Sequence, residues 1–556
     1  MHIDSAASRR NGKTYTRHLL RTSYREDGKV KKRTIANLSH CSDAEINAIR
    51  LALQHKEDLA TLGNPKDAIE LQQGRSVGAV VTIYQVAKRL GIVAALGSSQ
   101  EGKLALWQVI ARVVDQGSRL SAVRLAMHHA ASEVIGLKHG FNEDHLYQNL
   151  SWLLDHQAPI EDRLFRQMNQ KAPKDKEAKS PLFLYDVTSS YLEGRCNALG
   201  AFGYNRDRKR GKQQIVIGLL CDALGEPVSI QAFAGNTQDT ATLPSQLDKV
   251  ADRFGGGPVT VVGDRGMIKG PQMAAIEAHD WAYITALTKP QIESLLKDGS
   301  LQMSLFDQDL AEVELKEGTR VVLRRNPQRA QEIQAQRVDK EGVVRRELDL
   351  QNRYLLVHPR AKAETACRKL DAKIATLKLP GLRVAIEGRT LVLHADQEAL
   401  EAAQKLDGCY ALKTNLTKDQ ASKEIIHDRY KDLALVEQAF RVSKTGHLEV
   451  RPIYVRSEAS TRGHVLVVML AYKIVRELAR CWRSFNTTVE EGIHQLTTLC
   501  AQTVTMKKPD LAFNTVPKPS ADLAKLIEAA GVTLPRALAE RTAQVVTRKS
   551  LAKATI

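Results

Sequence analysis

The chain has 556 residues, of which 43% are hydrophobic, so it is long enough for several domains with a sizeable core. Its formal net charge of +18 indicates a polyanionic partner, although excess charge also aids solubility. The seven cysteines are odd in number and never spaced as a metal knuckle or a redox pair, which indicates reduced thiols. No signal peptide opens the chain, and the apolar run at residues 465–472 is too short to span a bilayer. We therefore expect a soluble, cytoplasmic protein.

The first 40 residues are strongly basic, with ten Lys or Arg against three Asp or Glu. Residues 19–38 alternate apolar and polar side chains around Asp27-Gly28, a pair typical of a two-residue β-hairpin turn. A basic hairpin of this kind either contacts DNA or forms an edge ribbon packed on its own protein, and the pattern does not separate these interpretations.

Residues 71–170 are predicted to form a helical domain. From residue 77 to residue 154, apolar side chains recur at helical spacing, for example at Ile83, Val86 and Leu90. The segment at 171–180 (KAPKDKEAKS) is charged and nearly free of large apolar groups, so it is predicted to be a linker.

Three strand patterns follow the linker. Residues 183–185 form a short apolar run, and Asp186 comes directly after it, so we expect Asp186 at the end of a strand. Residues 215–221 and 227–233 are predicted to be antiparallel strands with a turn at Gly225, which completes a three-stranded meander.

A helix and a fourth strand come next. Residues 239–254 have apolar side chains at helical spacing, and residues 259–262 read as a buried strand whose exit holds Asp264. This order of elements is ribonuclease-H-like, and in it the first and fourth strands lie side by side. Asp186 and Asp264 would then meet although they are 78 positions apart (264 minus 186). Each alone is more often a turn former or a helix N-cap, but a pair of close carboxylates needs a cation such as Mg²⁺ or Mn²⁺.

Residues 291–415 are predicted to form a mixed insertion, after a short strand at residues 281–286. Within it we expect a helix at residues 361–377 and four strands, at residues 319–324, 354–358, 382–386 and 390–394. Its basic side chains either line a duplex or form a solvated face. They are Arg320, Arg324, Arg325, Arg329, Arg337, Arg345 and Arg346.

The core resumes with a strand at residues 410–412 and a helix predicted over residues 428–444. One stripe of that helix, opposite an apolar face, carries Tyr430, Leu433, Glu437, Arg441 and Lys444. The stripe is either a reactive front or a solvated face on which Glu437 and Arg441 form an ordinary i,i+4 pair.

Several segments together match one known pattern, namely YDVTSS, RDRKRGKQQ, FAGNTQD, GDRGM, FRVSK and RPIY. With them the chain resembles the DDE-type transposases of bacterial insertion sequences, in the branch with a Tyr-Arg-Glu-Lys signature. The signature is Tyr, two residues, Arg, three residues, Glu, six residues, Lys. Tyr430, Glu437 and Lys444 fit this spacing, whereas Leu433 stands where the arginine is expected, so no arginine role carries over.

The resemblance implies an α/β fold. A ribonuclease-H-like catalytic core would be interrupted by a mixed, strand-containing insertion and preceded by the basic β-hairpin and the helical domain. It also implies Asp186, Asp264 and Glu437 as catalytic residues and as metal ligands for two Mg²⁺ ions, which Mn²⁺ can replace. The implied DNA contacts come from Tyr430, Arg441 and Lys444 beside the scissile bond, and from Arg206, Arg208, Lys209, Arg210 and Lys212 along the backbone.

The implied function is that of a transposase, which binds the ends of its insertion sequence and catalyses metal-dependent DNA cleavage and strand transfer. Its partner would be double-stranded DNA, both transposon ends and target, with a homodimer in the DNA complex and a nucleoid-associated location when bound. The alternatives are a host nuclease on the same fold and a transposase-derived DNA-binding protein. The presence of all three acids favours the enzyme.

The chain is accordingly divided into seven predicted segments. These are a basic hairpin region for DNA-end binding (1–70), a helical domain (71–170), a linker (171–180), the first part of the core (181–290), the insertion (291–415), the second part of the core (416–490) and a basic C-terminal tail (491–556). The tail would serve either dimerisation or DNA contact.

Overall fold

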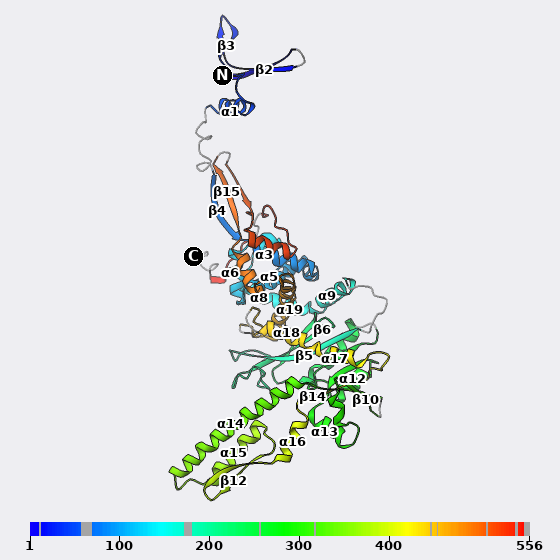
Figure 1. Ribbon diagram of the computed structural model, residues 1–556. Helices are drawn as coiled ribbons and strands as arrows, with labels where there is room; N and C mark the ends of the chain where they lie inside the picture. The colour runs from blue at the N-terminus through cyan, green and yellow to red at the C-terminus, as the bar shows by residue number, and fades with distance from the viewer. Residues whose placement is uncertain are drawn as a thin grey trace.

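The structure is a computed structural model that describes residues 1–10, 13–56, 69–171, 181–254, 257–315, 318–444, 447–452, 454–507, 510–539 and 543–549. Figure 1 shows a small N-terminal sheet at one end, helices in the middle, and a large sheet with the insertion at the other end. Of the predicted linker only Lys171, the last residue of a helix, lies within the described residues. No helix in these ranges combines the length and the apolar composition that crossing a membrane requires.

The N-terminal sheet has three antiparallel strands, β1 (His2–Arg10), β2 (Lys13–Glu26) and β3 (Lys29–Asn37). The predicted hairpin is confirmed as β2 and β3. Asp27 and Gly28 at its turn have φ angles of 49° and 74°, the left-handed values that this type of turn requires. Strand β1, which the pattern did not predict, pairs with β2, and helix α1 (Asp43–Gln54) follows the sheet.

Helices predominate in the next part of the chain, as predicted. They are α3 (Gly78–Arg89), α4 (Ile92–Leu96), α5 (Gln100–Val114), α6 (Arg119–His128), α7 (Ala131–Ile135), α8 (Glu143–Asp155) and α9 (Gln157–Lys171). The much later helix α19 (Glu458–Cys481) packs against α5 and α8 and is buried along most of its length. The apolar run at residues 465–472 is therefore part of a helical core.

Two segments that are far apart in the sequence form a second small sheet, which was not predicted. Strand β4 (Ile69–Ser76) pairs with β15 (Cys500–Lys507), and β15 pairs with β16 (Asp510–Thr515). Helices α20 (Val489–Thr497) and α21 (Ala521–Ala529) flank these strands in sequence, and α20 packs on α3.

The large sheet has eight strands in the order β10-β11-β14-β9-β8-β5-β6-β7. The strands are β5 (Leu182–Tyr191), β6 (Gln214–Asp222), β7 (Pro227–Ala234), β8 (Thr260–Gly263), β9 (Ala282–Ala286), β10 (Ala311–Glu314), β11 (Arg320–Arg325) and β14 (Cys409–Thr414). The predicted meander β5-β6-β7 is confirmed, with Gly225 in the turn at φ 72°. So is the parallel pairing of β5 with β8.

Side chains of β5 alternate between two packed faces, as a strand's period of two requires. Leu184 belongs to the core that includes α18 and α19, whereas Phe183 and Tyr185 belong to the core on the opposite face. Asp186 and Thr188 follow Leu184 at intervals of two, so they project on the α18 side of the sheet.

Two predicted single helices are broken. Residues 239–254 form α10 (Asp239–Thr242), α11 (Pro244–Lys249) and a π-helical turn (Val250–Phe254), because Pro244 lacks an N–H group and starts a new helix. Residues 428–444 are divided between α17 (Lys423–Lys431) and α18 (Leu433–Lys444), which meet at Asp432.

The insertion is only partly separate from the core. Strands β10, β11 and β14 extend the large sheet, whereas α14 (Pro327–Val357), α15 (Ala363–Leu377), β12 (Leu382–Glu387) and β13 (Thr390–Ala395) form an apolar core of their own. Figure 1 shows α14 and α15 extending away from the sheet. The predicted strand at residues 354–358 is wrong, because Tyr354 to Val357 are the last turn of α14. Helix α13 (Lys289–Lys297) leads into the insertion and α16 (Gln397–Lys405) lies within it, whereas α12 (Gly270–Glu277) lies between β8 and β9 of the core.

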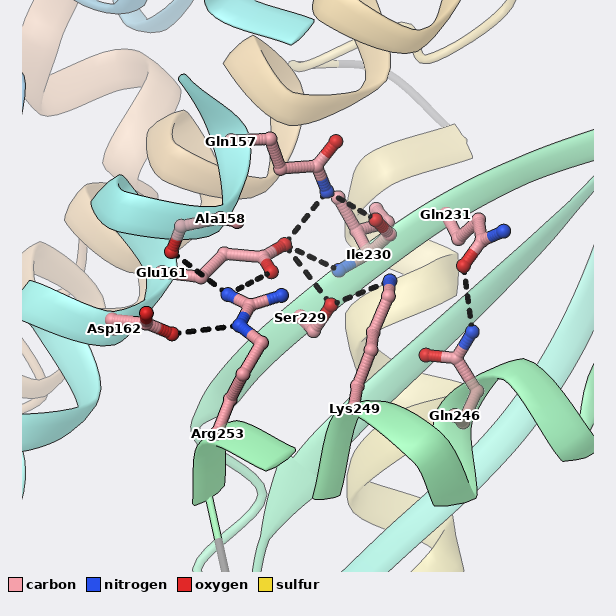
Figure 2. Close-up of polar contacts among 10 residues, drawn as sticks. All are labelled: Gln157, Ala158, Glu161, Asp162, Ser229, Ile230, Gln231, Gln246, Lys249 and Arg253. Carbon is pink, nitrogen blue, oxygen red and sulfur yellow. Dashed lines mark hydrogen bonds and ion pairs between the residues drawn. The ribbon is translucent and has the colours of Figure 1, made fainter. Parts of the chain in front are cut away.

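A buried polar network joins α9 to the large sheet (Figure 2). The side chain of Glu161 is fully buried, and its Oε1 atom accepts hydrogen bonds from Gln157 at 2.7 Å and Ser229 at 3.0 Å. Its other oxygen pairs with Arg253 at 3.0 Å, and Arg253 also binds Asp162 at 2.7 Å. Each oxygen of the buried carboxylate is therefore satisfied, which fixes the helical region against β7 and the π-helical turn at Val250–Phe254.

Candidate active site

Asp186 lies inside strand β5, at the point where the pairing of β5 with the parallel strand β8 ends and the pairing with the antiparallel strand β6 continues. The prediction that the strand stops before Asp186 is wrong, because β5 runs on to Tyr191 opposite β6. The parallel pairing of β5 with β8 does stop there, at Tyr185 and Gly263. Asp186 and Asp264 are the next residues after this pair, so the structure brings the two aspartates together.

Glu437 reaches the same place from α18, which packs against β5. It is exposed on a helix whose other face, with Val436, Ala439 and Phe440, is buried. Tyr430 lies on α17, and Leu433 is buried, so these two residues do not continue the exposed stripe that was predicted for one helix.

The three acids line one cavity of about 440 Å³. The pKa of the Asp186 carboxyl is raised to about 7, chiefly by burial and further by the negative charges of Asp264 and Glu437. The Val187 amide, which donates to Asp186 Oδ1 at 2.7 Å, and the charge of Arg206 offset only part of this rise. Carboxylates that oppose one another's ionisation in this way need a proton or a cation among them.

Two basic residues with predicted DNA contacts lie in this cavity and are held by acids. Arg206 donates to both carboxylate oxygens of Asp239 at 2.7 Å. Lys444 pairs with Asp207 at 2.5 Å and donates to Thr188 Oγ1 at 3.2 Å. Both cations are thus anchored at the cavity wall beside the three acids.

The cavity is also lined by Asp207, Asp239 and Thr188, which were not predicted as site residues. A signal was present for each, since Thr188 belongs to YDVTSS, Asp207 to RDRKRGKQQ, and Asp239 ends FAGNTQD. What the pattern lacked was the pairing of each acid with its cation, which depends on how loops fold over the sheet.

The other basic residues of the 206–212 segment face solvent. Arg208, Lys209 and Arg210 are exposed, and Lys209 lies 5.8 Å from the ring centre of Tyr191. Lys212 pairs with Glu193 at 3.0 Å. Arg441, on α18, is exposed and lines the cavity of the three acids.

A larger cavity of about 660 Å³ adjoins the site on the side of the insertion. Asp264 and Tyr430 line it together with Arg329 and Arg337. Tyr430 and Asp264 line the same cavity. Burial and the negative charge of Asp264 raise the pKa of the Tyr430 hydroxyl. The basic run predicted for the insertion includes Arg320. This side chain is buried and pairs with Glu312 at 2.8 Å, so it lies neither on a duplex-binding surface nor on a solvated face.

The donors fit a hard divalent cation in kind and in charge, since all three are carboxylates and one has a pKa near 7. As the side chains stand in the described residues, however, no group of three or more His, Cys, Asp or Glu is arranged so that it could hold a metal ion.

A mixed sheet with acids converging from two adjacent parallel strands and a covering helix defines a ribonuclease-H-like α/β enzyme. The family model described as the transposase DDE domain matches residues 177–474, more than half of the chain. The model described as the N-terminal domain of IS1634 family transposases matches residues 3–65. The chain therefore belongs to the DDE transposases of insertion sequences, enzymes that catalyse DNA transposition with divalent metal ions.

No curated protein matches the chain. Among solved structures, the cryo-EM structure of a piggyBac transposase synaptic complex with hairpin DNA is similar over 77% of this chain and 82% of that chain. The two chains are 8% identical, with a TM-score of 0.35.

Proposed function

We propose that Asp186, Asp264 and Glu437 hold two Mg²⁺ ions, which Mn²⁺ can replace, and that they are the catalytic residues of this transposase. When bound, the ions supply Lewis-acid stabilisation of the attacking and leaving oxygens in phosphodiester displacement. The observation that carries the proposal is the convergence of the three acids on one cavity. The raised pKa of Asp186 supports it, because a carboxyl group with acidic neighbours gains most from added positive charge.

The cations of the cavity position DNA. Arg206 and Lys444 are anchored by Asp239 and Asp207, so their charge is fixed beside the three acids, where a scissile phosphate needs it. Tyr430 and Arg441 flank the same position from α17 and α18. Further contacts to the backbone come from four residues of one loop, Arg208, Lys209, Arg210 and Lys212.

Cleavage and strand transfer use the same arrangement of residues. Both are in-line displacements at a phosphodiester, with water or a 3′-hydroxyl as the nucleophile, so no covalent enzyme intermediate is needed. Joining two ends favours a homodimer in the DNA complex. In this assignment the N-terminal region at residues 1–70 binds the DNA end, and the insertion at residues 291–415 covers the DNA at the cavity it shares with Tyr430.

The test is cleavage of a labelled insertion-sequence end by the variants Asp186→Asn, Asp264→Asn and Glu437→Gln. Each is expected to lose at least about 100-fold in single-turnover rate and to keep end binding within about threefold, because only a ligand charge is removed. Asp248→Asn is the matched control, since Asp248 is an exposed acid on α11 outside the cavity.

Each variant decides the role of its own residue. Cleavage close to that of Asp248→Asn removes the substituted acid from the site. Loss of both binding and cleavage, with a lowered melting temperature, assigns the acid to the fold instead.

A further inference from the structure

A third cavity, of about 380 Å³, is rich in arginine and lies apart from the three acids. It is formed where the loop between α5 and α6 meets α8, the start of α19, and the residues Glu449, Arg451, Tyr454 and Val455. Figure 1 shows α5, α6, α8 and α19 together in the middle of the molecule. Its charged and aromatic lining includes Arg112, Arg119, Tyr147, Glu449, Arg451 and His464.

Arg112 is 5% exposed and is held by backbone carbonyl groups instead of an acid. It donates to Gln116 O at 2.5 Å and to Gly117 O at 2.9 Å. Its buried Nε atom has no hydrogen-bond partner among the described residues. A buried N–H of a charged group without a partner is costly, so this atom points to an acceptor that the chain itself does not supply.

Arg119 is also 5% exposed, and its guanidinium is fixed by neutral partners. It donates to Gln108 Oε1 at 2.5 Å and lies 3.3 Å from His464 Nδ1. His464 Nε2 lies 3.2 Å from Val450 O, so Nε2 carries the proton and Nδ1 accepts from Arg119. The imidazole is therefore neutral and leaves the charge of Arg119 uncompensated.

The cavity carries an excess of positive charge. Neither Arg112 nor Arg119 takes part in an ion pair within the described part of the chain, and burial lowers the pKa of Arg112 to about 10 and that of Arg119 to about 9. Glu449 lies nearby but pairs with Arg451 at 2.8 Å. Ser118 caps α6 at the cavity, so the N-terminal end of that helix dipole adds to the positive potential.

We propose that this cavity binds a phosphate group, and that the phosphate is part of the DNA backbone. Two guanidinium groups and a helix N-terminus form the donor set that suits a tetrahedral oxyanion, and arginine is the usual residue for phosphate recognition. The DNA source rests on the proposed function. It is favoured by Arg451, which also contacts Tyr191 and pairs with Glu193 at 2.8 Å.

That contact connects the cavity to the strand of Asp186. Tyr191 and Asp186 are five residues apart on β5, about 17 Å along the strand. A duplex held at the three acids by its scissile phosphate thus has neighbouring phosphates within reach of the arginine cavity.

The first test uses the unmodified protein and inorganic phosphate as the probe. At constant ionic strength, replacing chloride by phosphate is expected to raise the melting temperature in a saturable way. Hydrogen exchange at the N-terminal amides of α6 is expected to slow by about tenfold at saturating phosphate. No stabilisation beyond that in chloride, together with unchanged exchange at α6, overturns the phosphate site without any variant being made.

The second test compares Arg119→Gln with Arg124→Gln, which removes the same charge from an exposed position on the same helix. Arg119→Gln is expected to abolish stabilisation by phosphate and to weaken binding of an insertion-sequence end by about tenfold, whereas Arg124→Gln keeps both. Arg119→Lys, which keeps the charge, is measured alongside, so that a failure of the glutamine variant to fold does not end the test.

The stabilisation test and the end-binding test together distinguish free phosphate from a phosphate of the DNA backbone. If phosphate stabilises the protein but Arg119→Gln and Arg119→Lys bind the end as tightly as Arg124→Gln, the cavity takes free phosphate and the DNA assignment is wrong. Failure of this proposal leaves metal-dependent cleavage and its loss in Asp264→Asn unaffected, so it is distinguishable from failure of the proposed function.

Discussion

The carboxyl group of Asp186 lies where burial and two neighbouring acids all oppose its ionisation. Its folded-state pKa of about 7 is above the ordinary value of 3.8. The protonated carboxyl therefore contributes stability that is fully present below about pH 4 and is lost as the pH rises through 7. Above that pH the folded protein holds a carboxylate that benefits from a nearby cation.

We expect Mg²⁺ to raise the melting temperature more at pH 8 than at pH 6. Below pH 7 the ion must displace a proton from Asp186, so its affinity falls by about tenfold per pH unit. Asp186→Asn should remove most of this difference, and the measurement is a Mg²⁺ titration of thermal unfolding at both values. An equal effect of Mg²⁺ at pH 6 and pH 8 would show that Asp186 is not a ligand.

His464 gives the opposite dependence on pH. Burial and the charges of Arg112 and Arg119 hold its pKa well below the usual 6.5, so the folded protein keeps it neutral while the unfolded chain binds a proton. The stability is present above pH 6.5 and is lost as the pH falls, by about 1.4 kcal/mol per pH unit.

His464→Gln should flatten this acidic loss, because a glutamine amide can donate to Val450 O and accept from Arg119 without titrating. Unfolding free energies at pH 7.5 and pH 5.5 check this, with His145→Gln as the control, since His145 is an exposed histidine. If both variants lose the same stability on acidification, His464 is not the responsible group.

The β2-β3 hairpin carries basic side chains of two kinds. Arg21 pairs with Asp4 at 2.8 Å and Lys31 with Glu26 at 2.7 Å, so part of their charge is already compensated within the sheet. Arg25 and Arg33 are exposed, and no ion pair of either is found within the described residues. The unpaired arginines are the ones expected to contact DNA phosphates.

The double variant Arg25→Ala and Arg33→Ala should therefore weaken end binding and reduce the slope of log affinity against log salt by about 1 to 2. Removing the paired residues Arg21 and Lys31 should change the slope less. Binding isotherms across a salt series measure both. An unchanged slope in the first variant would make the hairpin a purely structural ribbon.

Among the helices and strands, the sequence predicted the four strands around the candidate site, whereas β1, β4, β15 and β16 were not predicted. Strands β5, β6, β7 and β8 are short apolar runs between turn residues, a local pattern that survives in any sheet. The helix break at Pro244 follows from a missing N–H group, which hydrophobic periodicity does not record, and the apolar spacing continues across the break at Asp432. An apolar run such as Tyr354 to Val357 suits a strand or a helix end equally. The convergence of Asp186 and Asp264 could be inferred from topology, whereas the ion pairs of Arg206 and Lys444 form between loops that no periodicity describes.

In the whole molecule, the buried network of Glu161 connects the helical region to the large sheet (Figure 2). Glu161→Gln should destabilise the protein by about 3 kcal/mol. Arg253 then loses a buried anionic partner, and one of the groups that donates a hydrogen bond to Glu161 faces the glutamine NH₂, which cannot accept it. Asp162→Asn is the matched control, since Asp162 binds the same arginine but is partly exposed, and it should cost less than about 1 kcal/mol. Thermal unfolding followed by tryptophan fluorescence compares the two, and equal losses would contradict a special role for Glu161.

The pairing of β4 with β15 also has a consequence during protein synthesis. Ser76 and Cys500 are register partners 424 positions apart (500 minus 76), so at about 5 to 20 residues per second the ribosome supplies the partner of β4 roughly 20 to 85 s after β4 itself. A chain that stops at Leu499 should expose β4 as an open edge and associate with other chains, which size-exclusion chromatography of that truncation would reveal. Asp186, Asp264 and Glu437, the proposed catalytic acids, are all translated before β15. A prematurely terminated chain therefore carries all three acids and still has an unpaired β4 edge.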